Sequence, residues 1–555
     1  LTLSPMMCSK MLKSHANPSK FESTVDNMLN KVTRSYHKLL HSVLDNRSVV
    51  LLFAFIVLIS LPIIFSFIPS QLAPEEDQGV VVVIGTTPST SNNDYIQQNM
   101  ELIAQIIGKQ PQAEASLAMI GVPTTSQGMA IGPLVPWDER KLSQKEISNN
   151  INKEAKKLSG INAIAYQMPS LPGASGGLPI QFVITSSASF ETLFSIGSNV
   201  LAKAKASPNF VYTDINLKYD SGLVKLSIDR EAAGAYGVTM QAIGQALGSM
   251  MSGGYINRVN IDGRSYEVIP QVERIYRSNP DMLSQYYVTA QNGTAIPLSS
   301  LVSYEVVGQA KSLPHFNQMN SISIDAVPAP GVAMGDAISF FEQLAKTDLP
   351  QGFNYTFMGE ARQFVEEGNS LYITFALAIS IIFLVLASQF ESLRDPLVIL
   401  FTVPLAISGA LIALGWTHVS GSTSLNIYSQ VGLITLVGLI TKHGILICEV
   451  AKEEQVEKGA KKLDAIIEAA TIRLRPILMT TSAMIAGLMP LLFATGAGAV
   501  SRYNIGLVII AGLAIGTLFT LFVLPVMYTY IASEHNLQEG KEKISNETAE
   551  ISTIK

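Results

Sequence analysis

The stretch that decides the fold is residues 425–448, LNIYSQVGLITLVGLITKHGILIC. It is nearly uncharged and exceeds the roughly 20 apolar residues that a helix needs to cross a bilayer core of about 30 Å. One such run would also fit a buried helix of a large soluble protein, but the chain has five more. They lie at 49–68, 371–390, 397–416, 476–495 and 505–531. We therefore predict a membrane protein with six transmembrane helices.

The composition agrees with this prediction. The chain has 555 residues, a mean hydropathy of +0.31 and only 15% charged residues, which is too apolar for a soluble enzyme. Both cysteines, Cys8 and Cys448, lie beside apolar runs, so we expect no disulfide framework outside the membrane. The net charge is −5 and the Lys and Arg residues form no long basic stripe, which argues against a nucleic-acid partner.

The distribution of Lys and Arg predicts the orientation. These residues gather before the first apolar run and between the fourth and fifth runs, which places both segments in the cytoplasm. The long segment between the first and second runs is then outside. Residues 1–8, LTLSPMMC, resemble the last turn of a membrane helix whose beginning has been removed, rather than a signal peptide. The tail after the last run is polar enough to be disordered.

The external segment alternates β-rich and helical patterns. Strand–helix units with return strands, such as those at 80–84, 93–107 and 161–166, predict α+β subdomains of the split βαβ (ferredoxin-like) kind. The Asn292-Gly293 pair predicts a β-hairpin in a strand-rich section. The fold class is therefore a membrane α-helical protein with a large α+β insert of several small subdomains.

Enzyme motifs give no positive signal. The sequence has no Walker A motif, no CxxC and no HExxH, and its seven histidines are scattered. A GxSxG pattern at 173–177 lies between Pro172 and Pro179, which predicts a loop rather than a nucleophile elbow. The acidic run at 75–77 is a candidate cation site, but a solvated turn before the first external strand is the more ordinary reading. We expect no enzyme activity, no cofactor and no metal site.

Lys442 is the candidate functional residue within the membrane. An ammonium at this depth costs roughly 2.5–3.5 kcal/mol on insertion scales, so it usually faces a partner or a water path. Gly438 lies on the same helix face and would let another helix approach closely. The alternative is a lysine that extends to the membrane surface. None of the six runs carries Asp or Glu at depth, so the counter-charge is expected on helices outside this sequence.

Other polar residues accompany Lys442. Arg473, Arg475 and Pro476 are expected to open the fifth span, with Thr480 in the hydroxyl run that follows. Each alone is ordinary, but together with Lys442 they predict a hydrated polar cluster of the kind that proton relays use. His443 is able to titrate near neutral pH, but it points about 100° away from Lys442 on a helix, so its place in a relay stays open.

Four motifs carry a resemblance to a known family. They are LAPEEDQG at 72–79, KHGILICE at 442–449, RLRPILMTT at 473–481, and TGAGA at 495–499 followed by Leu524-Pro525. In order and spacing they resemble the C-terminal half of multidrug efflux pumps of the resistance-nodulation-division (RND) superfamily, in the hydrophobe/amphiphile branch. The resemblance covers nearly the whole chain.

The resemblance implies a proton-driven exporter in the bacterial inner membrane, with twelve spans in two halves and a large periplasmic domain. It implies a homotrimer that works with a periplasmic adaptor (membrane fusion) protein and an outer-membrane channel. In this family the lysine matching Lys442 pairs with two aspartates of the N-terminal half, which is missing here, and residues matching Arg473 and Thr480 complete the proton relay. Most members have Asn where this chain has His443.

The resemblance also implies the site that binds amphiphilic small molecules. Residues 117–124 match a wall and switch loop of the drug pocket, with aliphatic residues where aromatics are usual, and two further residues would line an outer access cleft. The implied substrate-binding residues are Leu117, Met119, Val122, Thr124, Ile180 and Phe182.

The resulting division of the chain has nine segments. It places the end of a truncated helix at 1–9, a cytoplasmic linker or amphipathic helix at 10–48, a span at 49–68, a porter subdomain at 69–170, a second porter subdomain at 171–225 and 311–368, a docking subdomain at 226–310, five spans at 369–531 and a cytoplasmic tail at 532–555.

Three alternatives to drug/proton antiport remain at this point. The first is an RND-type exporter of metal ions or lipids, although Lys442 argues against the metal branch. A membrane receptor or assembly scaffold is a second alternative. Such a protein would have no need of an unpaired ammonium deep in the membrane. The third is a degraded gene product or one piece of a split pump.

Overall fold

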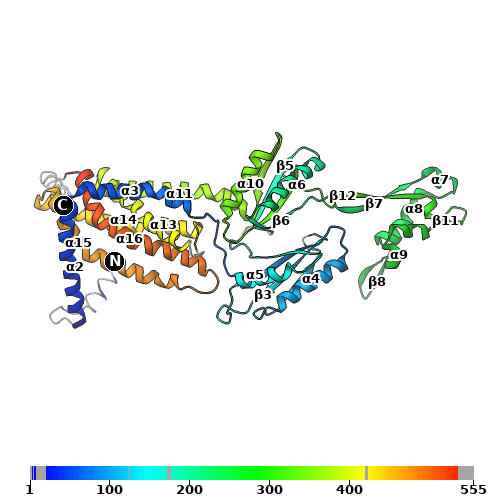
Figure 1. The fold of residues 1–555 in the computed structure, drawn as a ribbon, viewed down its shortest axis with the longest axis horizontal. Helices are drawn as coiled ribbons and strands as arrows, with labels where there is room; N and C mark the ends of the chain where they lie inside the picture. Colours follow the sequence, from blue (N-terminus) through cyan, green and yellow to red (C-terminus); the bar gives the residue numbers. More distant parts are fainter. Residues whose placement is uncertain are drawn as a thin grey trace, which may run out of the picture.

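The computed structural model describes residues 3, 6–7, 20–122, 124–171, 177–418 and 423–534. Most of the expected helix end at 1–9, residues 173–176 of the GxSxG motif and most of the C-terminal tail lie outside the described residues. The described part is elongated, with long helices at one end, two sheets in the middle and a small distal unit at the other end (Figure 1).

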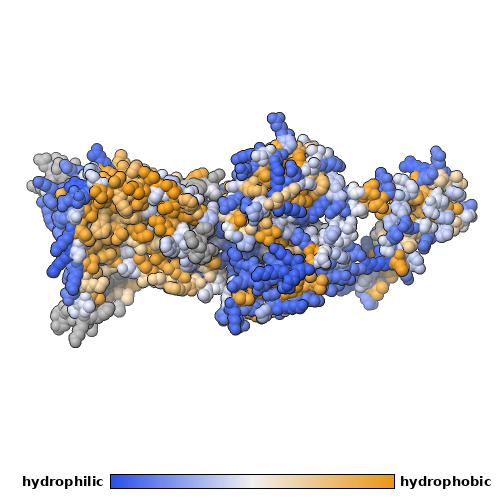
Figure 2. Space-filling model, in the orientation of Figure 1, coloured by the Kyte–Doolittle hydropathy of each residue, from blue (hydrophilic) through white to orange (hydrophobic). Residues whose placement is uncertain are grey.

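Six helical segments of the described chain are long and apolar enough to cross a membrane. Each overlaps one of the six apolar runs in the sequence, and the surface they form is mostly apolar, in contrast to the external part (Figure 2). They are α3 (Arg47–Phe67), α11 (Gly359–Phe390), the pair α12 (Arg394–Leu400) and α13 (Thr402–His418), α14 (Ile427–Lys458), α15 (Lys462–Leu492) and α16 (Ala499–Ile531).

The start of α15 differs from the expectation. The helix begins at Lys462, so Arg473, Arg475 and Pro476 lie well inside it rather than at its opening. The early turns form a helix because Ala465, Ile466, Ala469 and Ala470 bury one side of it against the bundle. Packing of this apolar face extends the helix by several turns before residue 476. The hydropathy of the run that begins at 476 does not reveal this extension.

Helix α2 (Lys20–Asp45) crosses one end of the bundle (Figure 1). It is amphipathic, and its buried Tyr36 donates a hydrogen bond to the carbonyl of Leu521 at 2.6 Å. On the same helix Asp26 pairs with Arg475 at 3.1 Å. These contacts hold α2 against α15 and α16.

The first sheet follows α3. Its elements are β1 (Val80–Thr86), α4 (Asn93–Gly108), β2 (Leu117–Ile120), β3 (Gln127–Pro133), α5 (Gln144–Ala155) and β4 (Asn162–Tyr166), and the antiparallel strands have the order β2-β3-β1-β4. Strand alternation directs Val81 and Val83 into a core with α4 and α5, whereas Val82 and Ile84 face the second unit and contact it near Tyr212. One sheet thus has two buried faces.

The second sheet is interrupted by the distal unit. The strands of this sheet and the two helices that lie between them in the chain are β5 (Ile180–Ser186), α6 (Phe190–Ala206), β6 (Phe210–Ile215), β13 (His315–Phe316), β14 (Met319–Pro328), α10 (Met334–Asp348) and β15 (Phe353–Met358). β14 pairs with β6 and β13 on one side and with β5 on the other, and β5 pairs with β15. The long strands therefore follow the same order as those of the first sheet. β15 leads directly into α11.

The distal unit sits on a two-stranded ribbon of β7 (Ser221–Ile228) and β12 (Val302–Gln309) (Figure 1). Between these strands, a small core that includes Ile243, Leu283 and Leu298 joins the remaining elements. The predicted hairpin at Asn292-Gly293 is confirmed. The remaining elements are α7 (Arg230–Ala235), α8 (Met240–Leu247), η1 (Gly248–Ser252), β8 (Asn257–Ile261), β9 (Arg264–Val268), α9 (Arg274–Arg277), η2 (Pro280–Gln285), β10 (Tyr287–Thr289), β11 (Ala295–Pro297) and η3 (Leu298–Ser300).

Candidate functional site

Lys442 lies on a face of α14 that the rest of the described chain leaves uncovered. Val431, Thr435, Gly438 and Lys442 are all exposed and follow one another at helical spacing. A Cβ atom added to Gly438 would meet no heavy atom within 4 Å. The opposite face of α14 is buried against α13 and α16 through residues such as Leu436 and Ile440. The ammonium therefore projects from an apolar helix toward space that another element can fill.

Arg473 and Thr480 lie on α15 and do not contact Lys442. Among the described residues no hydrogen bond or ion pair joins any two of the three. The Nε atom of Arg473 is buried without a hydrogen-bond partner in the described chain. The hydroxyl of Thr480 donates to the carbonyls of Pro476 and Ile477 at 3.0 and 3.1 Å. The three predicted relay residues thus lie on neighbouring helices but are not assembled here.

His443 has the opposite environment to Lys442. Its side chain is 0% exposed and lies between α15 and α16. Nε2 lies 3.4 Å from the hydroxyl of Thr481, and Nδ1 lies 3.5 Å from that of Thr517. The angle between consecutive helix residues therefore separates the exposed lysine from a buried polar cluster. The sequence reasoning missed Thr517, although a hydroxyl inside an otherwise apolar run was a visible signal.

The predicted substrate wall lies at the edge of the first sheet. Leu117 and Met119 are on β2, an edge strand, and Leu117 is exposed. Val122 and Thr124 are exposed in the turn between β2 and β3. The Thr124 hydroxyl donates to the side chain of Gln127 at 3.0 Å. Three of these four residues are exposed and Met119 is partly buried, and their side chains are apolar or carry a hydroxyl.

Ile180 and Phe182 require a correction. Both are 0% exposed on β5, in the core between the second sheet and α10. Phe182 stacks on Phe341 with ring centroids 5.0 Å apart. β5 lies between β14 and β15 in its sheet, and α6 and α10 cover the face that carries these two residues, so they pack inward rather than line an access cleft.

A cleft does occur between the two sheets, lined by other residues. It has a volume of about 490 Å³ and includes Thr86, Lys156, Asn162, Asp214 and Lys218 in its wall. Asp214 forms an ion pair with Lys218 at 2.8 Å and lies directly opposite Asp325 in the β6–β14 register. Burial raises the pKa of the Asp325 carboxyl to about 6. The sequence reasoning missed this acidic pair because strand pairing, not spacing, brings it together.

The acidic run at 75–77 is only partly solvated: Glu75 is exposed, whereas Glu76 is buried and Asp77 is half-buried, and each of the three carboxylates has a protein partner. Glu75 pairs with Lys145 at 3.0 Å. Glu76 is 6% exposed and accepts hydrogen bonds from the backbone N–H of Ser501 at 2.6 Å and from the Ser501 hydroxyl at 2.5 Å. Ser501 lies in the first turn of α16, so Glu76 links the segment after α3 to the last membrane helix.

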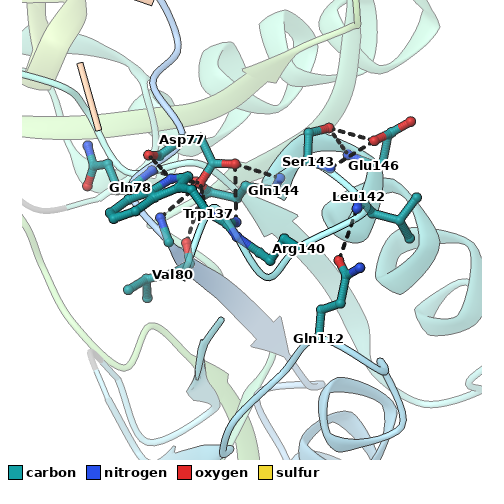
Figure 3. Close-up of polar contacts among 11 residues, drawn as sticks. Asp77, Gln78, Val80, Gln112, Trp137, Arg140, Leu142, Ser143, Gln144 and Glu146 are labelled. Atoms are coloured by element: carbon teal, nitrogen blue, oxygen red, sulfur yellow. Dashed lines mark hydrogen bonds and ion pairs between the residues drawn. The ribbon is translucent and has the colours of Figure 1, made fainter. Parts of the chain in front are cut away.

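Asp77 organises the start of the first sheet (Figure 3). Its carboxylate accepts hydrogen bonds from Arg140 at 2.9 and 3.2 Å, from Trp137 Nε1 at 3.1 Å and from the backbone N–H groups of Gln144 and Gly79 at 3.0 Å. Burial acts to raise the pKa of Asp77, but these hydrogen bonds outweigh it and the net pKa is lowered. Glu76 and Asp77, adjacent in sequence, thus connect α16 with α5 and β1.

The long apolar helices indicate a membrane protein. The comparisons with known proteins identify its class as a transporter of the RND type. The chain belongs to the AcrB/AcrD/AcrF family, whose model matches residues 1–532. This is a family of transporters rather than of enzymes.

Three curated relatives illustrate the similarity. An uncharacterized transporter of Haemophilus influenzae is 50% identical over 538 residues, which are 96% of this chain and 52% of that protein. The multidrug export protein AcrF of Escherichia coli is 30% identical over 552 residues, 96% of this chain and 52% of AcrF. The multidrug/solvent efflux pump membrane transporter MepB of Pseudomonas putida is 30% identical over 564 residues, 99% of this chain and 53% of MepB. The chain spans about half the length of these relatives.

Proposed function

We propose that this chain forms the C-terminal half of a proton-driven efflux transporter of the bacterial inner membrane. In this proposal the transporter exports amphiphilic small molecules by drug/proton antiport, with protons as the coupling ion. The N-terminal half supplies the relay carboxylates. Two of the similar proteins are named for multidrug or solvent export, which supports this substrate class.

The observation that carries the proposal is the environment of Lys442. An ammonium on a membrane helix is costly unless a carboxylate or water compensates it. Here it lies on an uncovered face of α14 beside Gly438, where another helix has room to approach. No described residue pairs with it, and the chain covers about half of its relatives. An incoming helix with acidic side chains would supply the carboxylate that the Lys442 ammonium lacks among the described residues.

The external part fits the proposed cycle. When the long strands of each unit are numbered in chain order, both sheets have the order 2-3-1-4. This is the strand order of a ferredoxin-like fold, and it supports the assignment of the two units as porter subdomains. The cleft between them would open and close as the units move, with Leu117, Met119, Val122 and Thr124 as the pocket wall nearby. The distal unit is the proposed docking subdomain. A homotrimer, a periplasmic adaptor and an outer-membrane channel complete the proposed assembly.

The test uses the chain joined to the N-terminal half in a bacterial strain without its own efflux pumps. Lys442→Ala should abolish resistance to amphiphilic drugs and drug-dependent proton flux into proteoliposomes, because the relay loses its cation. Lys458→Ala is the matched control, since Lys458 lies on the same helix in an exposed i,i+4 pair with Glu454. Unchanged resistance in the Lys442→Ala strain refutes the relay.

The same strains separate the alternative substrates. Drugs, metal ions and lipids are supplied in turn, and export of each is measured in the wild type. Proton-coupled export of metal or lipid without export of amphiphilic drugs would replace the proposed substrate class. Absence of any proton-coupled export would favour a scaffold or receptor.

A further inference from the structure

A buried polar cluster joins three membrane helices behind Lys442. It consists of His443 on α14, Thr481 on α15 and Thr517 on α16, which are 0%, 6% and 4% exposed. The ring nitrogens of His443 lie 3.4 and 3.5 Å from the two hydroxyl oxygens, which are themselves 3.4 Å apart. The cluster takes no part in the proposed relay through Lys442, Arg473 and Thr480.

The hydroxyl hydrogens of both threonines are already committed. Thr481 donates to the carbonyl of Ile477 at 2.8 Å, and Thr517 donates to the carbonyl of Leu513 at 2.6 Å. These distances are much shorter than those to the imidazole. Each hydroxyl has only one hydrogen to donate, so both oxygens face the ring as acceptors.

The number of protons on the ring then decides whether the cluster is satisfied. A neutral imidazole has one N–H and one lone pair, so one of its nitrogens faces a hydroxyl oxygen with no hydrogen between them. An imidazolium has two N–H groups and satisfies both contacts. We propose that His443 is a second proton-binding site of the transporter, in which one proton links α14 to α15 and α16.

Two factors keep this site from being permanently charged. Burial disfavours a cationic ring, and the adjacent Lys442 ammonium repels it. The described side chains of α13 include no titratable group. On α14 itself, the titratable groups that follow Lys442 and His443 most closely in the sequence are Cys448 and Glu449. The other helices packed around α14 carry Arg475 on α15, Tyr528 on α16, Asp395 on α12 and Glu367 on α11.

Proton binding is thereby coupled to helix contacts. Uptake adds a proton from water to the lone pair of the free ring nitrogen, forming one N–H bond and breaking no bond between heavy atoms. In the neutral state, a threonine hydroxyl must turn away from the carbonyl of Ile477 or Leu513 to donate to that nitrogen. The hydrogen bond from Thr481 to the Ile477 carbonyl is longer than that from Thr517 to the Leu513 carbonyl, and Thr481 is closer to the ring. Thr481 is therefore the side chain that turns.

This inference rests on the proposed function, but its first test does not use transport. The chain joined to its N-terminal half is labelled with ¹⁵N-histidine and placed in lipid nanodiscs, and the signals lost in His443→Asn assign the ring. The two nitrogen shifts of His443 should change from a neutral to a cationic pattern as the pH falls from about 8 to about 4. Shifts that stay constant over this range overturn the proposal.

Threonine variants separate a proton site from a structural histidine. Thr517→Val removes one acceptor of the cationic ring, so the transition should move toward lower pH by about one unit. Thr520→Val is the matched control, because Thr520 is equally buried on α16 and donates to the Gly516 carbonyl at 2.8 Å without contacting His443. Equal effects of the two variants would contradict the proposed coupling.

Transport supplies the second readout. His443→Asn should flatten the dependence of drug export on pH between about 5 and 8, because Asn does not titrate there. If Lys442→Ala leaves export unchanged, the relay fails but the ¹⁵N titration of His443 stands on its own. If the ring titrates but the pH profile of His443→Asn matches the wild type, the site has no role in transport.

Discussion

At the scale of single residues, pairing across strands creates charge environments that chain position does not reveal. Asp325 lies in the middle of β14, opposite Asp214 of β6, and accepts a hydrogen bond from Ser323 at 2.8 Å. Burial is the main cause of its raised pKa of about 6, and the neighbouring Asp214 adds to it. Folding therefore favours the neutral, protonated form of the Asp325 carboxyl over its ionised form.

The raised pKa predicts a pH-dependent stability. Between about pH 4 and 6 the folded state binds more protons at Asp325 than the unfolded state does, so its stability falls as the pH rises. Asp325→Asn keeps the neutral form at every pH. It should stabilise the protein by about 1–3 kcal/mol at pH 8 and by nothing below about pH 4. Thermal unfolding at the two pH values measures this, and an equal gain at both would contradict the assignment.

At the scale of elements, Glu76 fixes the start of α16. Its carboxylate accepts hydrogen bonds from two backbone N–H groups of the first turn, at Val500 and Ser501, where the helix dipole also favours a negative charge. Because Asp77 contacts the segments that begin β1 and α5, two consecutive residues join the start of α16 to the first sheet.

Removal of this link should be measurable. Glu76→Ala should destabilise the protein by about 1–3 kcal/mol, since it leaves buried N–H groups unpaired. Hydrogen exchange at the Ser501 amide should accelerate accordingly. Glu75→Ala is the control, because Glu75 forms an exposed pair with Lys145 that contributes less than about 1 kcal/mol. Similar exchange in both variants would show that Glu76 does not cap the helix.

At the scale of the whole molecule, two faces of α14 have different roles. The face with Gly444 packs inside this chain: a Cβ there would lie 2.9 Å from Ile399 and 3.1 Å from Leu524. The face with Gly438 and Lys442 is uncovered. Since the relatives are about twice as long, the uncovered face is the proposed contact with the N-terminal half.

Two glycine variants on this helix test the assignment. Gly438→Leu should weaken assembly with a separately expressed N-terminal half while leaving the membrane insertion and protease resistance of this chain intact. Gly444→Leu should instead reduce protease resistance, because overpacking of a bundle costs about 1–3 kcal/mol. Co-purification and limited proteolysis distinguish the two effects. Loss of protease resistance in Gly438→Leu would place that face inside the chain.

The sequence alone determined the class of this protein. Runs of apolar residues cross a bilayer whatever their neighbours are, so the six helices could be found from hydropathy. Strand alternation and turn residues similarly predicted β1, α4 and the Asn292-Gly293 hairpin, because these signals are local. Lys442 stood out because a charge in an apolar run needs no tertiary structure to be recognised as costly.

Tertiary structure decided which face of each helix or strand is buried and which is exposed. It buried Ile180 and Phe182 in a core, because α6 and α10 pack over the face of β5 that carries them. It extended α15 beyond its apolar run, and it brought Asp214 next to Asp325 across more than a hundred residues of chain. It also turned His443 inward and Lys442 outward on one helix. Contacts between distant segments set these environments, and no local pattern in the sequence encodes them.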